Sequence, residues 1–286
     1  MNGGVDMSIK IITDSGSDLP KEIIEKNNIK VIPLEVTINN QTYLDSVDIN
    51  SEQFYKKMSK SKELPKTASP SPQKFLEEFN CKEENIFIIT LSSQLSSTYN
   101  NALLAKQIYL DENDDKNIYV IDSLSASVGE GLVVLKLIDL LENSKSYEQI
   151  AIKASNYAKK CQVYFLLETL DNIVKGGRVG KAAGHIASLL SIKLILKSDG
   201  NGVVDLAEKV RGSKKAFRRF VSLAGENNDN FDNKTLAIAH ANCYQKAVKY
   251  KEMIEERYNF KNIIISTIGS TIGTYTGENG LLIAIL

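Results

Sequence analysis

Tryptophan, histidine and cysteine are scarce in this sequence. Its 286 residues include no tryptophan, two histidines and three cysteines. Cys81, Cys161 and Cys243 are scattered and odd in number, which argues against a disulfide framework and favours reduced structural thiols. His185 and His240 stand at no metal-ligand spacing from each other or from a cysteine. We therefore expect neither a disulfide scaffold nor a metal site.

Long apolar runs and an excess of one charge are also missing. The longest apolar stretches, such as 86–89 and 281–286, fall far short of the roughly 18 residues that suggest a transmembrane helix. The first ten residues, MNGGVDMSIK, lack the apolar region of a signal peptide. Basic and acidic residues each total 35, so we expect no general affinity for nucleic acid. These absences predict a cytoplasmic protein without an integral membrane segment.

Neither common nucleotide-binding motif is complete. Gly129-Glu130-Gly131 lacks the third glycine of the dinucleotide fingerprint. Gly180-Lys181 is followed by Ala182, and Lys175 stands where a P-loop needs its first glycine. The sequence therefore predicts no bound nucleotide cofactor.

The most informative stretch runs from Glu84 to Ala105. Ile86 to Ile89 are consecutive β-prone residues, typical of a strand that is buried on both faces of a parallel sheet. An amphipathic helix follows, with Tyr99, Leu103, Leu104 and Ile108 at helical spacing. Hydroxyl side chains fill the connection between the two: Thr90, Ser92, Ser93, Ser96, Ser97 and Thr98.

Strands followed by polar turns and helices recur along the first half of the chain. Strands are predicted at 8–13, 30–38, 86–89 and 117–121, and this alternation indicates a parallel sheet. Ligands bind at the carboxyl ends of such strands, where a helix N-terminus favours anions. We expect an anion held by hydroxyls without a formal countercharge; alternatively, these hydroxyls only cap helices. Asp18 is expected to cap the helix that Pro20 opens.

A second α/β domain is expected after Cys161, which gives predicted domains at 7–161 and 162–286. Between 172 and 219 the chain has eleven basic and three acidic residues, the best candidate surface for an acidic partner. Residues 269–280 are rich in glycine and threonine and are predicted to form a long loop. Such loops usually line a site, although this one could simply be a connector that bends sharply.

Several motifs, taken in order, resemble those of the DegV family of bacterial fatty-acid-binding proteins. The resemblance covers nearly the whole chain, and the order and spacing of the motifs make it specific. The resembling segments are Thr13-Asp14-Ser15 with Ser17-Asp18-Leu19-Pro20, Thr67–Pro72, Ser92–Tyr99, Val120–Ser127, Lys175–Lys181 with Leu189–Leu196, and Ile268–Gly277.

The resemblance implies a two-domain α/β fold, with a Rossmann-like parallel-sheet domain and a second α/β domain, that holds one long-chain fatty acid between its domains. The fatty-acid carboxylate would meet Thr67 and Ser96, with Ser97 beside it. A separate ATP-dependent fatty-acid kinase would phosphorylate that carboxylate, and the acyl-phosphate would enter phospholipid synthesis. The protein would be a carrier and not an enzyme, and the basic residues Lys175, Arg178 and Lys181 would dock the kinase. Alternatively, these charges only solvate the start of a helix.

Three differences from the family pattern limit what the resemblance implies. Ser97 replaces a usual glycine, and Ala68-Ser69 replaces Ser-Gln. Tyr275-Thr276-Gly277-Glu278-Asn279 stands where the family commonly has His-Thr-Gly-Pro-Gly. Tyr275 could donate a hydrogen bond to the carboxylate in place of that histidine, or it could only pack.

Two other functions compete with fatty-acid binding. Helix-terminal hydroxyls also suit phosphate, so the protein could be an enzyme acting on a small phosphorylated or carboxylated metabolite. The basic segment alone would suit a regulatory or interaction protein.

Overall fold

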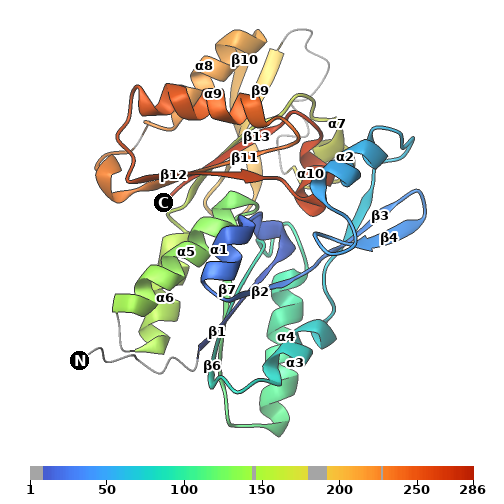
Figure 1. Ribbon diagram of the computed structural model, residues 1–286, viewed down its shortest axis with the longest axis vertical. Helices are drawn as coiled ribbons and strands as arrows, with labels where there is room; N and C mark the ends of the chain where they lie inside the picture. The colour runs from blue at the N-terminus through green and yellow to red at the C-terminus, as the bar shows by residue number, and fades with distance from the viewer. Residues whose placement is uncertain (1–8, 144–145, 180–191, 227) are drawn as a thin grey trace.

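Two large β-sheets organise the residues that the computed structural model describes, which are 9–143, 146–179, 192–226 and 228–286 (Figure 1). The first sheet has four strands in the order β2-β1-β6-β7, and all of its pairings are parallel. Its strands are β1 (Ile9–Asp14), β2 (Ile29–Ile32), β6 (Asn85–Thr90) and β7 (Asn117–Asp122).

Strand β6 is the centre of the first sheet and is buried along its whole length. Ile86 and Ile88 pack in the cluster that includes helices α3 (Pro72–Phe79) and α4 (Thr98–Glu112). Phe87 and Ile89 point the other way, toward α5 (Val128–Asn143) and α6 (Tyr147–Ala158). Successive side chains of a strand alternate between faces, so four consecutive apolar residues supply both faces. The prediction of a strand buried on both sides is confirmed.

Helix α4 does not pack against the sheet through its leucines. Ala102 and Ala105 are fully buried, whereas Leu103, Leu104 and Ile108 are 37%, 50% and 42% exposed. Alanines add little bulk between a helix and its neighbours, so the close contact is made on that face. The expected packing of the larger side chains was therefore wrong.

The second sheet has six strands in the order β10-β9-β8-β13-β11-β12. Only the β11–β12 pairing is parallel. Helices α8 (Ser213–Leu223) and α9 (Tyr244–Glu255) pack on one face, and the other face joins a cluster shared with α5 and α2 (Ser51–Met58). The strands are β8 (Gln162–Leu166), β9 (Ile192–Ser198), β10 (Val204–Arg211), β11 (Thr235–His240), β12 (Asn262–Thr267) and β13 (Leu281–Ile285).

A small antiparallel sheet, β4-β3-β5, extends beside the two large ones. Its strands are β3 (Glu35–Ile38), β4 (Gln41–Leu44) and β5 (Lys66–Ala68). The strand predicted at 30–38 is thus two strands, β2 and β3, in different sheets. Pro33 stands between them and has no N–H to donate to a ladder, which separates the two pairings.

Two further predictions about turns and helix ends were wrong. Residues Ser270–Thr276 form helix α10 instead of lying in a continuous loop. Asp18 does not cap α1 (Lys21–Lys26), because Pro20 occupies the N-cap position and the Asp18 carboxylate accepts hydrogen bonds from Ser127 and Gly269. Asp18 therefore joins distant parts of the chain.

The predicted α/β fold class is confirmed, with a parallel sheet in the first half and a second sheet covered by helices in the other. The boundary between Cys161 and Gln162 stays our proposal. Among the described residues, no helix combines the length and apolar composition needed to cross a membrane.

Candidate functional site

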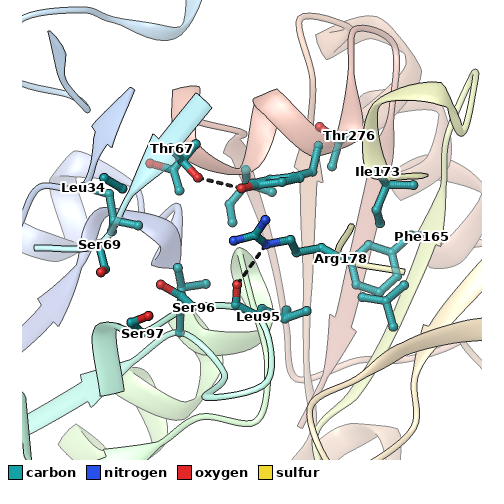
Figure 2. Close-up of a pocket in the computed structure, with 16 residues that line it drawn as sticks. Leu34, Thr67, Ser69, Leu95, Ser96, Ser97, Phe165, Ile173, Arg178 and Thr276 are labelled. Atoms are coloured by element: carbon teal, nitrogen blue, oxygen red, sulfur yellow. Dashed lines mark hydrogen bonds between the residues drawn. The ribbon is translucent and has the colours of Figure 1, made fainter. Parts of the chain in front are cut away.

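A pocket of about 310 Å³ lies between the first and second halves of the chain. This volume is at the lower end of the roughly 300–1,000 Å³ of typical ligand sites. Figure 2 shows Thr67, Ser69 and Ser97 on one side of the Arg178 guanidinium, and Phe165 and Ile173 on the other. The polar lining includes Thr67, Ser69, Ser96, Ser97, Arg178 and Tyr275, and the apolar lining includes Leu34, Leu91, Leu95, Phe165, Ile173, Val204 and Ile272.

Thr67 and Tyr275 form a hydrogen bond across the pocket. Their hydroxyl oxygens are 2.6 Å apart, and either one can be the donor. Thr67 lies in β5 and Tyr275 in α10, so this contact joins segments far apart in the sequence. Both side chains are half-buried. A third polar atom near this pair could therefore accept a hydrogen bond from one of the two hydroxyls.

Arg178 and Gly176 hold the Tyr275 ring from the side of α7 (Asp171–Lys175). The Arg178 guanidinium carbon lies 5.3 Å from the ring centroid, at cation–π distance. A Cβ atom on Gly176 would come within 2.6 Å of the Tyr275 ring, so only glycine permits this approach. Arg178 also donates from Nε to the carbonyl of Leu95, 3.3 Å away, and from Nη1 to that of Gly176, 2.7 Å away.

The position of Arg178 corrects the expectation of a site without a formal countercharge. The guanidinium is part of the pocket lining and keeps donors beyond those bound to the Leu95 and Gly176 carbonyls. A carboxylate bound beside Thr67 would therefore have a cation near it. Sequence reasoning assigned Arg178 only to partner docking and missed this placement.

The β6–α4 turn supplies Ser96 and Ser97 to the pocket, but most hydroxyls of that turn are engaged elsewhere. Ser92 Oγ donates to the carbonyl of Gly202, 2.9 Å away. Ser96 Oγ lies 2.8 Å from Thr98 Oγ1 and accepts from the Thr98 amide at 3.3 Å. Ser97 is at the N-cap of α4 without a side-chain capping bond. Only two of the six expected hydroxyls line the pocket.

The structure brings four predicted site residues to one pocket: Thr67, Ser96, Ser97 and Tyr275. Of the predicted docking residues, Lys175 is exposed at the end of α7, and Lys181 lies outside the described residues. Thr271 and Ile272 line the pocket and were not singled out. Their spacing to Tyr275, four and three residues, is a helical signal that could have revealed them.

The described part of the chain contains no group of three or more His, Cys, Asp or Glu side chains arranged to hold a metal ion. The polar chemistry of the pocket is that of hydroxyls and one guanidinium.

Comparison with known proteins identifies the family. The family model described as "Uncharacterised protein, DegV family" matches residues 8–286. The chain belongs to the DegV family. A DegV domain-containing protein of Clostridium acetobutylicum is 36% identical over 272 residues, 94% of this chain and 95% of that protein.

Solved structures of DegV proteins share this fold over nearly the whole chain. A DegV family protein from Ruminococcus gnavus, refined with vaccenic acid, is 32% identical with a TM-score of 0.92, and covers 98% of this chain and 100% of its own. The Streptococcus pneumoniae Fatty Acid Kinase (Fak) B3 protein, loaded with linoleic acid, is 32% identical with a TM-score of 0.84 and coverages of 97% and 99%.

Proposed function

We propose that this DegV protein binds one long-chain fatty acid in the pocket between its two halves and presents the carboxylate to a fatty-acid kinase. The observation that carries the proposal is a pocket that combines a group of hydroxyls around Thr67 and Ser96 with a largely apolar lining, in a chain whose solved relatives hold vaccenic and linoleic acid.

The headgroup end of the proposed site consists of Thr67, Ser96, Ser97 and Tyr275, with Arg178 beside them. Hydroxyl donors orient a carboxylate, and hydrogen bonds to a charged group are stronger than those between neutral groups. Because Arg178 is already stacked on Tyr275 and bonded to two carbonyls, it adds positive charge without needing a bidentate ion pair. The carboxylate oxygen then stays available to attack a phosphoryl group.

The acyl end follows apolar lining residues away from these hydroxyls, including Phe165 and Ile173 (Figure 2). Each methylene that leaves water contributes about 0.8 kcal/mol, so the chain supplies most of the affinity. The polar end mainly sets the orientation. A short-chain acid with the same headgroup should therefore bind far more weakly.

The protein acts, in this proposal, as a cytoplasmic carrier and not as the catalyst. The sequence has no complete P-loop or dinucleotide fingerprint, so ATP would be held by the kinase. Lys175 and Arg178 are exposed near the pocket side of α7 and suit an acidic patch on that partner, with Lys181 as a third candidate. The relative from Streptococcus pneumoniae, a Fatty Acid Kinase B3 protein, supports this role.

Lipid extraction and native mass spectrometry of the purified protein test the proposal. We expect a bound fatty acid, and saturable rebinding of oleate by the delipidated protein. Octanoate and oleyl alcohol are matched controls, because one lacks the chain length and the other lacks the carboxylate. Delipidated protein that ignores oleate would contradict the proposal. Tight binding of a small phosphorylated or carboxylated metabolite instead would favour the alternative, an enzyme.

Substitutions at the headgroup end sharpen this test. Thr67→Val and Ser96→Ala should each weaken oleate binding by about 1 to 3 kcal/mol, because a buried carboxylate loses a donor. Binding of oleyl alcohol should change less. Unchanged oleate affinity in both variants would mean that the carboxylate lies elsewhere.

A further inference from the structure

Helix α10 starts without a capping side chain of its own. Gly269 occupies its N-cap position. The first free amides find acceptors on two aspartates from the first half of the chain. Gly269 N donates to Asp18 Oδ1 at 2.8 Å, and the amides of Ser270 and Thr271 donate to Asp45 Oδ1 and Oδ2, each at 3.1 Å. Ser270 Oγ also donates to Asp45 Oδ1 at 2.6 Å.

Both aspartates are buried, and Asp18 is held by further contacts. Asp18 is 7% and Asp45 1% exposed. Asp18 also accepts from the Ser127 hydroxyl, and its carbonyl accepts from the Ser266 hydroxyl. A Cβ on Gly269 would lie 3.1 Å from Asp18 Oδ1 and 3.3 Å from Asp45 Oδ1, so the turn is enclosed by the two carboxylates.

Further contacts connect this start of α10 to the pocket. A Cβ on Gly273 would lie 2.7 Å from the Tyr55 hydroxyl and 2.8 Å from Phe54, so the middle of α10 lies tightly against α2. Tyr275, in the last turn, reaches Thr67 at 2.6 Å. Since α10 has only seven residues, a shift of its first turn moves Tyr275 as well.

We propose that Asp18 and Asp45, here called the acid latch, are positioning residues that set α10 so that the Tyr275 hydroxyl meets the headgroup of the bound acid. They touch no ligand and act through the amides of Gly269, Ser270 and Thr271. The effect on ligand affinity rests on the proposed function, whereas the effect on α10 does not.

Other acidic groups surround the latch. Asp14 and Glu130 are buried near Asp18, and Tyr55 faces both latch residues from α2. Burial, reinforced by the charges of Asp45 and Asp14, raises the pKa of Asp18 well above its usual range. Glu130 Oε1 accepts from the Thr13 hydroxyl at 2.8 Å, and among the described residues it makes no hydrogen bond to α10, which makes it the matched control for loss of one buried carboxylate.

Hydrogen exchange by mass spectrometry on the ligand-free protein tests the latch directly. Asp45→Ala should speed exchange in the peptide covering residues 269–277 by about tenfold, comparable to losing a helix cap. Asp45→Asn, which keeps one acceptor, should speed exchange less. This variant replaces Asp45→Ala in the test if the alanine variant does not fold. Glu130→Gln should leave the exchange rate of this peptide unchanged. Equal exchange in Asp45→Asn, Asp45→Ala and the wild type would overturn the latch.

Oleate binding tests whether the latch acts through Tyr275. In folded protein, Asp45→Ala should raise the Kd by about tenfold, and the same change in a Tyr275→Phe background should raise it much less. Faster exchange with an unchanged Kd, or equal effects in both backgrounds, would reduce the latch to a helix cap and overturn the positioning role. Wild-type protein that fails to bind oleate would refute the proposed function instead, while the exchange result still decides the latch.

Discussion

Two strand-to-helix turns reach the same pocket and are held by different kinds of contact. In the β6–α4 turn, Gln94 N donates to Ser92 Oγ at 3.2 Å, and Thr98 N donates to Ser96 Oγ at 3.3 Å. In the β12–α10 turn, Gly269 and Ser270 donate to Asp18 and Asp45, which lie 251 and 225 residues earlier in the chain. The β6–α4 turn thus has hydroxyls that cap its own amides, besides contacts with distant segments such as the Ser92 hydroxyl to the Gly202 carbonyl, whereas the first amides of α10 are capped by distant carboxylates.

This difference decides which turn can be recognised from sequence. Serine and threonine that follow a strand bond to nearby amides, so their presence indicates a helix start. A turn that is capped from elsewhere has no such signature. Two carboxylates from other strands also hold the β6–α4 turn: Asp14 Oδ2 accepts from the Leu91 amide at 2.8 Å, and Asp122 Oδ1 accepts from the Ser93 amide at 3.2 Å.

Asp14 is one of the carboxylates that hold the β6–α4 turn, and its complete burial makes it open to a test by pH. Burial raises its pKa from 3.8 to about 7, although hydrogen bonds from Leu91 and Gly16 oppose this, and the charge of Asp45 adds to it. A raised pKa means that the folded state binds the proton more tightly. The resulting stabilisation is complete below about pH 4 and is lost as the pH rises through about 7.

We expect the free energy of unfolding to fall by on the order of 1 to 4 kcal/mol between pH 4 and pH 8 from this group. When urea denaturation is repeated across that pH range, the free energy of unfolding of Asp14→Asn should fall less with pH than that of the wild type. The exposed carboxylate Asp114 offers a control, since Asp114→Asn should keep the wild-type slope. Identical slopes for Asp14→Asn and wild type would show that burial does not raise the pKa of Asp14.

Strands such as β1, β6 and β7 could be predicted because each has a local apolar pattern, whereas the short strands β4 and β5 were not predicted. The apolar run 86–89 predicted β6, and its alternating contacts with two helix layers confirm it. Helix α10 was missed because Gly269, Gly273 and Gly277 recur every four residues, and glycine disfavours helices. Gly277 ends the helix at a φ of 66°, where glycine is favoured, whereas Gly273 is explained by packing against Phe54 and Tyr55, which no local pattern reveals.

The hydroxyl residues of the candidate site could be predicted from the sequence, whereas the apolar residues that line it could not. Thr67, Ser96, Ser97 and Tyr275 were singled out and line one pocket. The apolar residues come from several elements whose sequence patterns indicate only burial. Arg178 is exposed, as expected for a docking residue, but its contacts with Tyr275 and Leu95 depend on tertiary structure and could not be predicted.

Gly176 tests whether Tyr275 is held from the far side of the pocket as well as through α10. Gly176→Ala places a Cβ within 2.6 Å of the Tyr275 ring, and the backbone there has an ordinary φ of −73°. The ring must move, so we expect a loss of about 1 to 3 kcal/mol in unfolding free energy, measured by urea denaturation, and weaker oleate binding. In a Tyr275→Ala background the same substitution should cost little. Equal losses of unfolding free energy in both backgrounds would show that the need for glycine at position 176 does not come from the Tyr275 ring.

The smallest expected effect concerns the N-cap of α4, where Ser97 has no side-chain capping bond. Ser97→Ala should change the unfolding free energy by less than about 0.5 kcal/mol, as for a surface substitution. Asn50 is the matched control, because its side chain accepts from Gln53 N at 2.9 Å at the start of α2, and Asn50→Ala should cost about 1 kcal/mol. Urea denaturation of both variants measures the difference. A cost at Ser97 equal to that at Asn50 would mean that its hydroxyl caps α4 in solution and is not free for a ligand.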